Sequence, residues 1–284
     1  MDPAGTPVTE AAPVARMARH CPVCGTPSAE GRPLGIAPPP WSLVACRSCD
    51  FAHLAEAPPY EALAEDLAWE QTHAAERVRR ARANPVITAV DQATRFRLAL
   101  RRRKPRDVIA AHARPGPVIE IGCGGGEQLT PPPPGFTPFG IDISVALSAK
   151  ARAAFRAHGG DCLTASALDG LNQLPSGQFT AALLHAYLEH EADPSAVLVG
   201  LARVLTPDAV VVVKVPNYGS WNRRLMGAKW CGYRFPDHLN YFTPASLAAL
   251  ARKAGFATTF PPGWALPTSD NMWALLHPEP SRAG

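Results

Sequence analysis

A glycine-rich stretch, residues 118–126, restricts the possible folds of this chain more than any other feature. The apolar run Val118–Ile121, with one acid inside it, leads into Gly122, Gly124 and Gly126, and the segment Gly140–Asp142 follows fourteen residues later. This order is typical of a strand, a tight turn, a helix and a second strand. Glycine is required in such a turn because a Cβ would hold a ligand off the backbone and disfavour a positive φ. Twenty residues after Gly122, Asp142 then lies where an acid can bind ribose hydroxyls.

Three later segments resemble motifs of one enzyme family. They are Phe179–His190, then Arg203–Pro207 with Val210–Asn217, and finally Trp230–Pro244 with Ala254–Phe256. In order and spacing they resemble the class I S-adenosylmethionine (SAM)-dependent methyltransferases, in the Methyltransf_23-like branch, over roughly residues 107–277. The glycine spacing G-x-G-x-G, in place of the G-x-G-x-x-G of nicotinamide-binding proteins, also favours SAM over NAD.

The resemblance implies a SAM site at the glycine turn. The turn's amides would approach the methionine part of SAM, Asp142 would accept both ribose hydroxyls, Ile143 and Ala167 would enclose the adenine, and Ser166 would reach its edge. Glu120 is either a ligand contact or an acid that caps the turn, and the Cys123 thiol is expected to be a small buried apolar group. The expected cofactor-binding residues are Glu120, Gly122, Cys123, Gly124, Gly126, Asp142, Ile143, Ser166, Ala167 and His185.

Methyl transfer needs alignment, and a base where the acceptor must lose a proton. His238 and His190 are the candidates for that base, although a lone histidine also commonly has a structural role. Segment 216–242 is rich in aromatic residues and is expected to cover the active site, which favours a small-molecule acceptor such as a sugar, lipid or natural-product intermediate. Its aromatic residues include Trp221, Trp230, Tyr233, Phe235, Tyr241 and Phe242. Methylation of structured RNA is the second choice, and a SAM-binding module without catalysis is the third.

Four cysteines near the N-terminus form two C-x-x-C pairs, Cys21 with Cys24 and Cys46 with Cys49. Two such turns complete a tetrahedral thiolate site of the kind that Zn²⁺ accepts, and Gly25 suits the positive-φ position of the first turn. Disulfides or buried thiols are the alternative. Residues 1–19 have no apolar run of the signal-peptide kind, so we expect a cytoplasmic protein in which disulfides are disfavoured. With all four ligands cysteine, the zinc is expected to be structural.

The charge is concentrated in one segment. Of a net charge of +4, residues 77–106 supply eleven basic residues against one acid, Asp91. Such a segment is either a solvated helix face or a grip for nucleic acid or an anionic substrate. No run of 18 apolar residues occurs, so no membrane span is expected. The pattern does not determine the oligomeric state.

Four regions are expected along the chain: a disordered tail over 1–19, a zinc ribbon over 20–55, a helical bridging segment over 56–112 and the methyltransferase domain over 113–278. From residue 117, short apolar runs alternate with capped helices, which predicts an α/β, doubly wound, Rossmann-like sheet. Because of prolines 131–134, only about one helical turn is expected after the glycines, over 125–130. The seven expected strands are 117–121, 138–142, 161–165, 179–184, 209–215, about 256–260 and 271–276.

Overall fold

The computed structural model describes residues 16–59 and 103–279. Residues 1–15 of the tail expected over 1–19, most of the bridging segment expected over 56–112, and the basic segment before residue 103 therefore lie outside the described residues. Among the residues described, no helix combines the length and the apolar character that crossing a bilayer requires.

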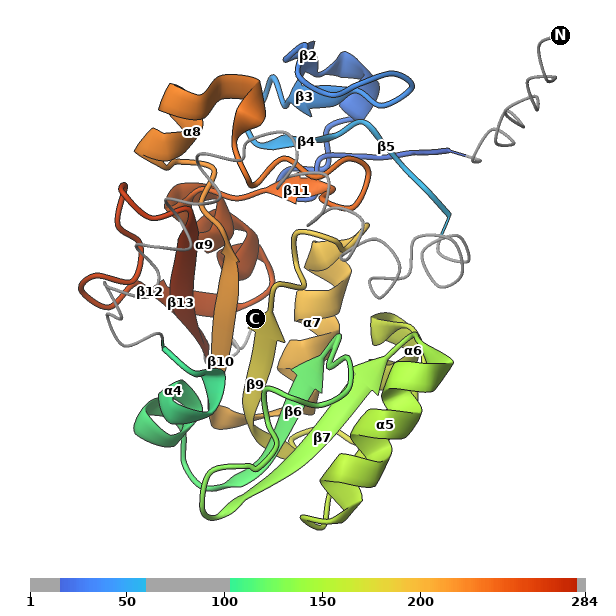
Figure 1. Ribbon diagram of the computed structural model, residues 1–284, viewed down its shortest axis with the longest axis vertical. Helices are drawn as coiled ribbons and strands as arrows, with labels where there is room; N and C mark the ends of the chain where they lie inside the picture. The colour runs from blue at the N-terminus through green and yellow to red at the C-terminus, as the bar shows by residue number, and fades with distance from the viewer. Residues whose placement is uncertain (1–15, 60–102, 280–284) are drawn as a thin grey trace, which may run out of the picture.

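A seven-stranded sheet forms the larger part of the molecule (Figure 1). Its order is β12-β13-β10-β9-β6-β7-β8, with β13 antiparallel to both neighbours and the other six strands running in one direction. The strands are β6 (Gly116–Ile121), β7 (Phe136–Asp142), β8 (Asp161–Thr164), β9 (Phe179–His185), β10 (Leu205–Pro216), β12 (Phe256–Thr259) and β13 (Asn271–Pro278). The doubly wound, Rossmann-like methyltransferase sheet predicted from the sequence is confirmed.

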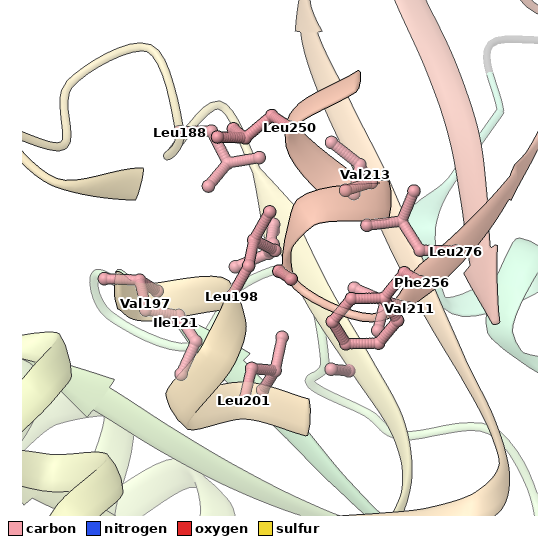
Figure 2. Close-up of a cluster of buried hydrophobic side chains, with 14 of the residues drawn as sticks. Ile121, Leu188, Val197, Leu198, Leu201, Val211, Val213, Leu250, Phe256 and Leu276 are labelled. Atoms are coloured by element: carbon pink, nitrogen blue, oxygen red, sulfur yellow. The ribbon is translucent and has the colours of Figure 1, made fainter. Parts of the chain in front are cut away.

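Helices cover both faces of this sheet. Alternate valines of β10 point to opposite sides, and each set joins a separate apolar cluster. Both clusters need a helical cover because a sheet buried on two faces must be apolar on both. One face packs on α4 (Pro105–His112) and α5 (Val145–Arg156), and the other on α6 (Ala167–Asn172), α7 (Pro194–Val204) and α9 (Pro244–Lys253). Figure 2 shows the second cluster, where leucines of α7 and α9 meet Val211 and Val213 of β10.

The helices begin where side chains can satisfy their first free amides. Ser144, Ser166 and Asp193 each accept a bond from the third amide beyond, and Thr243 forms a capping box with Ser246. Proline follows the cap at α7 and α9, where its missing N–H costs no hydrogen bond. After the glycine turn the expected helical turn over 125–130 is not formed, and Leu129 is instead fully buried in a series of turns.

The N-terminal cysteine region is built from short strands. The strands β2 (Arg32–Pro33), β3 (Leu43–Ala45) and β4 (Ala52–Leu54) form a sheet whose fourth strand, β11 (Asn240–Tyr241), comes from the far end of the chain. A second small sheet pairs β1 (Met17–Ala18) with β5 (Glu56–Ala57), so described structure begins ahead of residue 20. The remaining short elements are η1 (Ser28–Glu30), α8 (Trp221–Met226) and η2 (Gly227–Lys229).

The sheet shared with β11 attaches the cysteine region to the same end of the molecule as the carboxyl ends of the parallel strands (Figure 1). Arg19, which is buried, donates to the carbonyl oxygens of Leu54, Leu239 and Ala192 and to Oδ1 of Asn240. These bonds join the ribbon to the turn that follows β9.

Candidate functional site

The glycine turn lies at the carboxyl end of β6, where the strand order reverses direction. From β6 the chain runs outward to β7 and β8, then returns to the other side with β9. In open α/β sheets this switch point is where ligands bind. Gly122, Gly124 and Gly126 all have positive φ, at 67°, 53° and 82°. The tight turn predicted from the sequence is therefore confirmed, since all three glycines have the positive φ that it requires.

The three glycines face different surroundings. A Cβ on Gly122 would come within 2.5 Å of the Tyr187 ring, and one on Gly126 within 2.8 Å of the Phe155 ring. At Gly124 the nearest atom would be Oε2 of Glu127, 3.9 Å away. Gly122 and Gly126 are thus required by packing, whereas Gly124 leaves open space in which a ligand can approach the backbone.

Hydrogen bonds within the protein already engage amides of the turn. Gly122 N donates to Ile141 O at 2.8 Å, Gly126 N to Cys123 O at 2.9 Å, and Gly124 N to Oδ2 of Asp142 at 2.7 Å. The turn therefore offers a ligand mainly close backbone approach. The sequence reasoning had assigned these amides directly to the methionine part of SAM.

Asp142 ends β7 directly beside the turn. Its Oδ1 accepts from Ser144 N at 2.9 Å, and its Oδ2 accepts from Gly124 N. Because an ionised carboxylate has about four acceptor positions, these two bonds leave capacity for ribose hydroxyls. They also fix the carboxylate against the turn, so the acid is oriented before any ligand binds.

Glu120, in β6, is a buried acid at the same place. It is 2% exposed, and its Oε2 has no hydrogen-bond partner among the described residues. Burial raises the pKa of Glu120 well above its usual value, and the charges of Glu127 and Asp142 raise it further. A buried carboxyl group with one unpaired oxygen and two acidic neighbours fits a positively charged ligand. SAM carries a sulfonium and an ammonium group, so the residues present at this turn fit it.

The expected adenine residues lie on the next connections. Ile143 is half-buried directly after Asp142, and Ala167 is buried in the first turn of α6. The Ser166 hydroxyl caps α6, accepting from Asp169 N at 3.1 Å and donating to Oδ2 of Asp169 at 2.7 Å, so it is engaged within the chain. Cys123 is buried with its Sγ 3.6 Å from Sγ of Cys162, and this contact, together with burial, raises its thiol pKa.

His185 ends β9 and is not part of the group that His190 and His238 form with Glu189. Lys214 of β10 donates to its Nε2 at 3.2 Å, and burial together with that ammonium lowers the pKa of His185 to about 4. The ring is therefore neutral near pH 7. Its expected part in cofactor binding stays a prediction.

The turn after β9 brings His190 and His238 together with an acid that the sequence reasoning missed. The two imidazole rings meet edge to face with centroids 4.7 Å apart. Glu189 is 1% exposed, and one donor atom from each of Glu189, His190 and His238 lies within 4.8 Å of the others. Burial raises the pKa of Glu189 to about 8 and lowers that of His190 to about 4. The signal in the sequence is an acid directly before His190, although Glu191 directly after it carries the same signal.

The four N-terminal cysteines converge as predicted. Sγ of Cys21 lies 3.5 Å from that of Cys49, Sγ of Cys24 lies 3.4 Å from that of Cys46, and all four lie within 4.8 Å of one another. A zinc ion about 2.3 Å from each sulfur needs sulfurs about 3.8 Å apart, so the set fits a tetrahedral site. Each pair is followed by a left-handed residue, Gly25 at φ 82° and Asp50 at φ 57°.

The aromatic residues of segment 216–242 have a different role from the expected cover. Trp230, Tyr233 and Tyr241 are buried in a cluster with Leu43 and Leu54 of the ribbon, and Trp221 points outward, 54% exposed. Phe242 packs on Phe51 of the ribbon at 5.3 Å between ring centroids. These rings fill the contact between ribbon and sheet, so their number is not evidence for an apolar acceptor.

Comparison with known proteins identifies the class. Residues 92–259, more than half of the chain, match the family described as Methyltransferase domain, Methyltransf_23. The chain belongs to this family and is a SAM-dependent methyltransferase. A similar sequence is the ubiquinone biosynthesis O-methyltransferase of Thiobacillus denitrificans, 32% identical over 152 residues, which cover 50% of this chain and 64% of the relative. The match therefore spans less than two thirds of that protein's length.

Solved methyltransferases are similar to this chain at low sequence identity. A SAM-dependent methyltransferase of Thermotoga maritima is 19% identical, with 61% of this chain and 87% of that chain covered and a TM-score of 0.47. A methyltransferase of Haloferax volcanii, solved in complex with the Trm112 methyltransferase activator, is 17% identical, with 68% and 95% covered and a TM-score of 0.48. The assignment of this chain to the methyltransferases therefore depends on the family match and on the strand order of its seven-stranded sheet.

Proposed function

We propose that this methyltransferase transfers the methyl group of SAM to a hydroxyl of a small-molecule acceptor. The observation that carries the proposal is the placement of the Glu189, His190 and His238 group at the carboxyl end of β9, the strand next to the glycine turn. Both histidines belong to segments beside the donor site, and His190 is neutral near pH 7. The T. denitrificans relative, named as an O-methyltransferase of ubiquinone biosynthesis, supports an oxygen atom of a small molecule as acceptor.

In this proposal the chain's own residues bind and orient the reactants. Asp142 holds the ribose, Glu120 faces the cationic part of SAM, and Gly124 lets the ligand approach the backbone. SAM supplies a methyl group bound to a sulfonium sulfur. When an acceptor oxygen attacks this methyl group in line, the sulfur leaves as a neutral thioether. The group containing His190 and His238 receives the acceptor hydroxyl and assists removal of its proton.

RNA as acceptor, the second candidate, receives less support from the ribbon. Its four arginines, within the described residues 16–59, are all engaged inside the chain. Arg16 pairs with Glu56 at 2.7 Å, Arg32 with Asp50 at 3.6 Å, and Arg47 donates to Glu30 O at 2.8 Å, while Arg19 is buried. Three of the four are exposed, so what the ribbon offers a phosphate is mainly arginines already bonded to its own acids and carbonyl oxygens. We propose instead that the ribbon carries one structural Zn²⁺ on Cys21, Cys24, Cys46 and Cys49.

A labelled-methyl assay tests the proposal. The protein is incubated with methyl-labelled SAM and either a small-metabolite extract or total RNA, with Asp142→Ala as the impaired variant and Asp208→Ala as the matched surface control. We expect label in extractable small molecules. Asp142→Ala should lose this label and Asp208→Ala should keep it. Label in RNA would favour the second candidate. Tight SAM binding with no label in either pool would favour a module without catalysis.

A further inference from the structure

Glu189, His190 and His238 form a group that the family assignment leaves unexplained. The first two lie in the turn after β9, and His238 lies 48 residues further on, in the loop before β11. The loop is held against the turn by the amides of Leu239 and Asn240, which both donate to Glu189 O, at 2.7 and 3.0 Å. Two separate pieces of chain are thus fixed together around three side chains that can all bind a cation.

The hydrogen bonds of the two histidines determine their tautomers. Nδ1 of His190 lies 2.9 Å from Asp237 O, and Nδ1 of His238 lies 2.8 Å from Gly232 O. A carbonyl oxygen only accepts, so each Nδ1 carries the proton, which leaves the lone pair of each ring on Nε2. Imidazole ligands of metals are usually held in this way, with one ring N–H donated to a backbone carbonyl.

Glu189 completes the donor set with a carboxylate in an unusual environment. It is buried, and its Oε2 has no hydrogen-bond partner among the described residues. A buried carboxylate oxygen without a hydrogen-bond partner is costly unless a cation neutralises the group. Lys214 and Arg234 act on Glu189 electrostatically, so a bound ion would have to compete with two positive side chains.

We propose that Glu189, His190 and His238 bind a divalent transition-metal ion of the zinc type, at a second site separate from the four cysteines. Two imidazoles and one carboxylate suit Zn²⁺ and its neighbours, whereas Mg²⁺ and Ca²⁺ prefer oxygen ligands. Three protein ligands leave a fourth position open, which is the arrangement of catalytic zinc sites. His190 is only half-buried, so the group is not sealed from solvent.

The consequence for the acceptor rests on the proposed function, whereas metal binding itself does not. An acceptor hydroxyl bound to the ion loses its proton to water more readily, because the ion stabilises the negative oxygen. That oxygen then forms the new O–CH₃ bond while the C–S bond of SAM breaks and sulfur keeps the electron pair. The acceptor is therefore a hydroxyl compound whose oxygen can enter the open position.

Metal stoichiometry of the full-length protein is the test. After chelation and reloading with Zn²⁺, the wild type should hold about two equivalents and both Glu189→Gln and His238→Ala about one. His158→Ala, a change at an exposed histidine, should keep two and is the matched control. Reloading with Co²⁺ gives a readout without mutation, since only the cysteine site produces thiolate-to-cobalt charge transfer. The second equivalent should show ligand-field bands alone.

Each outcome decides the inference. One equivalent in the wild type, or a second equivalent that survives both Glu189→Gln and His238→Ala, would overturn it. A wild type that methylates a small molecule with only the cysteine site filled would leave the proposed function standing and remove the second site. Two equivalents of Zn²⁺ with no methyl transfer to any small molecule would support the second metal site and contradict the proposed function.

Discussion

Glu120 and Asp142 face the same turn from adjacent strands, yet the protein treats the two carboxylates differently. Asp142 accepts two backbone N–H bonds, whereas Oε2 of Glu120 has no partner among the described residues. Hydrogen bonds to the charged form stabilise it, and burial without them destabilises it. The two acids should therefore respond in different ways to substitution.

Asp142→Ala is expected to weaken SAM binding by at least tenfold, because each charge-assisted hydrogen bond is worth roughly 1.5–3 kcal/mol. Asp142→Asn removes the charge but keeps one amide oxygen that can accept one of the two loop bonds, so it should lose less affinity than Asp142→Ala. Asp208→Ala, which removes only an exposed ion pair with Arg114, serves as the control. Calorimetric titration with SAM measures all three, and binding like the wild type in Asp142→Ala would refute the role of Asp142.

Glu120→Gln is expected to make the SAM-free protein less sensitive to pH. The pKa of Glu120 is raised in the folded state, so folding binds a proton that the unfolded chain releases above pH 4.5. The folding stability of the wild type should therefore fall as pH rises from this value, and that of Glu120→Gln should fall less. Thermal unfolding between about pH 5 and pH 8 measures it.

Glu127→Gln is the control variant, because the pKa of Glu127 is shifted in the opposite direction to that of Glu120. Glu127 is partly buried, but its bond to Lys150 lowers its pKa overall. A lowered pKa adds stability above the unfolded pKa and loses it as pH falls, so this variant should not reproduce the change in slope. Identical pH profiles for wild type and Glu120→Gln would show that Glu120 does not titrate as inferred.

At the scale of elements, the sheet was predictable because its strands are short apolar runs between turn and cap residues. The valine run Val210–Val213 predicts a strand that is buried on both faces of the sheet. Asp193 followed by Pro194 predicts the first residues of α7. The segment after the glycines was predicted wrongly as one helical turn. There the burial of Leu129 ahead of four prolines determines the conformation, and no local propensity encodes that burial.

The candidate site was predictable only where its members are neighbours in sequence. The glycine turn, Asp142 and the two C-x-x-C pairs each have a local pattern. The meeting of His190 with His238 depends on how the loop before β11 docks, and docking depends on Arg19 and Asn240. Sequence reasoning also could not see that ribbon residues cover the aromatic side chains of segment 216–242.

Arg19→Ala is expected to destabilise the protein by about 2 kcal/mol or more, since buried carbonyls left without a donor cost about 1–3 kcal/mol. Burial lowers the pKa of Arg19 to about 10, but it stays charged near neutral pH. Arg16→Ala is the matched control, because an exposed ion pair such as Arg16 with Glu56 contributes about 0–1 kcal/mol. Urea unfolding compares them, and equal losses would contradict a joining role for Arg19.

At the scale of the whole molecule, the ribbon's sheet takes its fourth strand, β11, from the methyltransferase part of the chain, so loss of metal should alter structure beyond the cysteines. Cys24→Ser with Cys49→Ser is expected to lose about one equivalent of zinc and to speed amide hydrogen exchange at Leu54. That amide donates to Leu239 O, beside β11. Cys231→Ser, at an exposed cysteine, is the control. Unchanged exchange at Leu54 would mean that docking does not depend on the metal.

The charge distribution over the whole chain decides between small molecules and RNA. If the eleven basic residues of segment 77–106 gripped about six phosphates, affinity would fall about a thousandfold between roughly 50 and 200 mM salt.

We expect no such steep binding, because that segment has one aromatic residue, Phe96, on which a base could stack. At its described end, Arg103 donates to Gly263 O and lies over the Trp264 ring at 5.1 Å, and is thus engaged within the chain. Titration with total RNA, comparing wild type with Arg101, Arg102 and Arg103 changed to Ala, measures this. Tight, salt-sensitive binding abolished by the triple change would make RNA the better acceptor, because only a phosphate grip depends on both salt and these side chains.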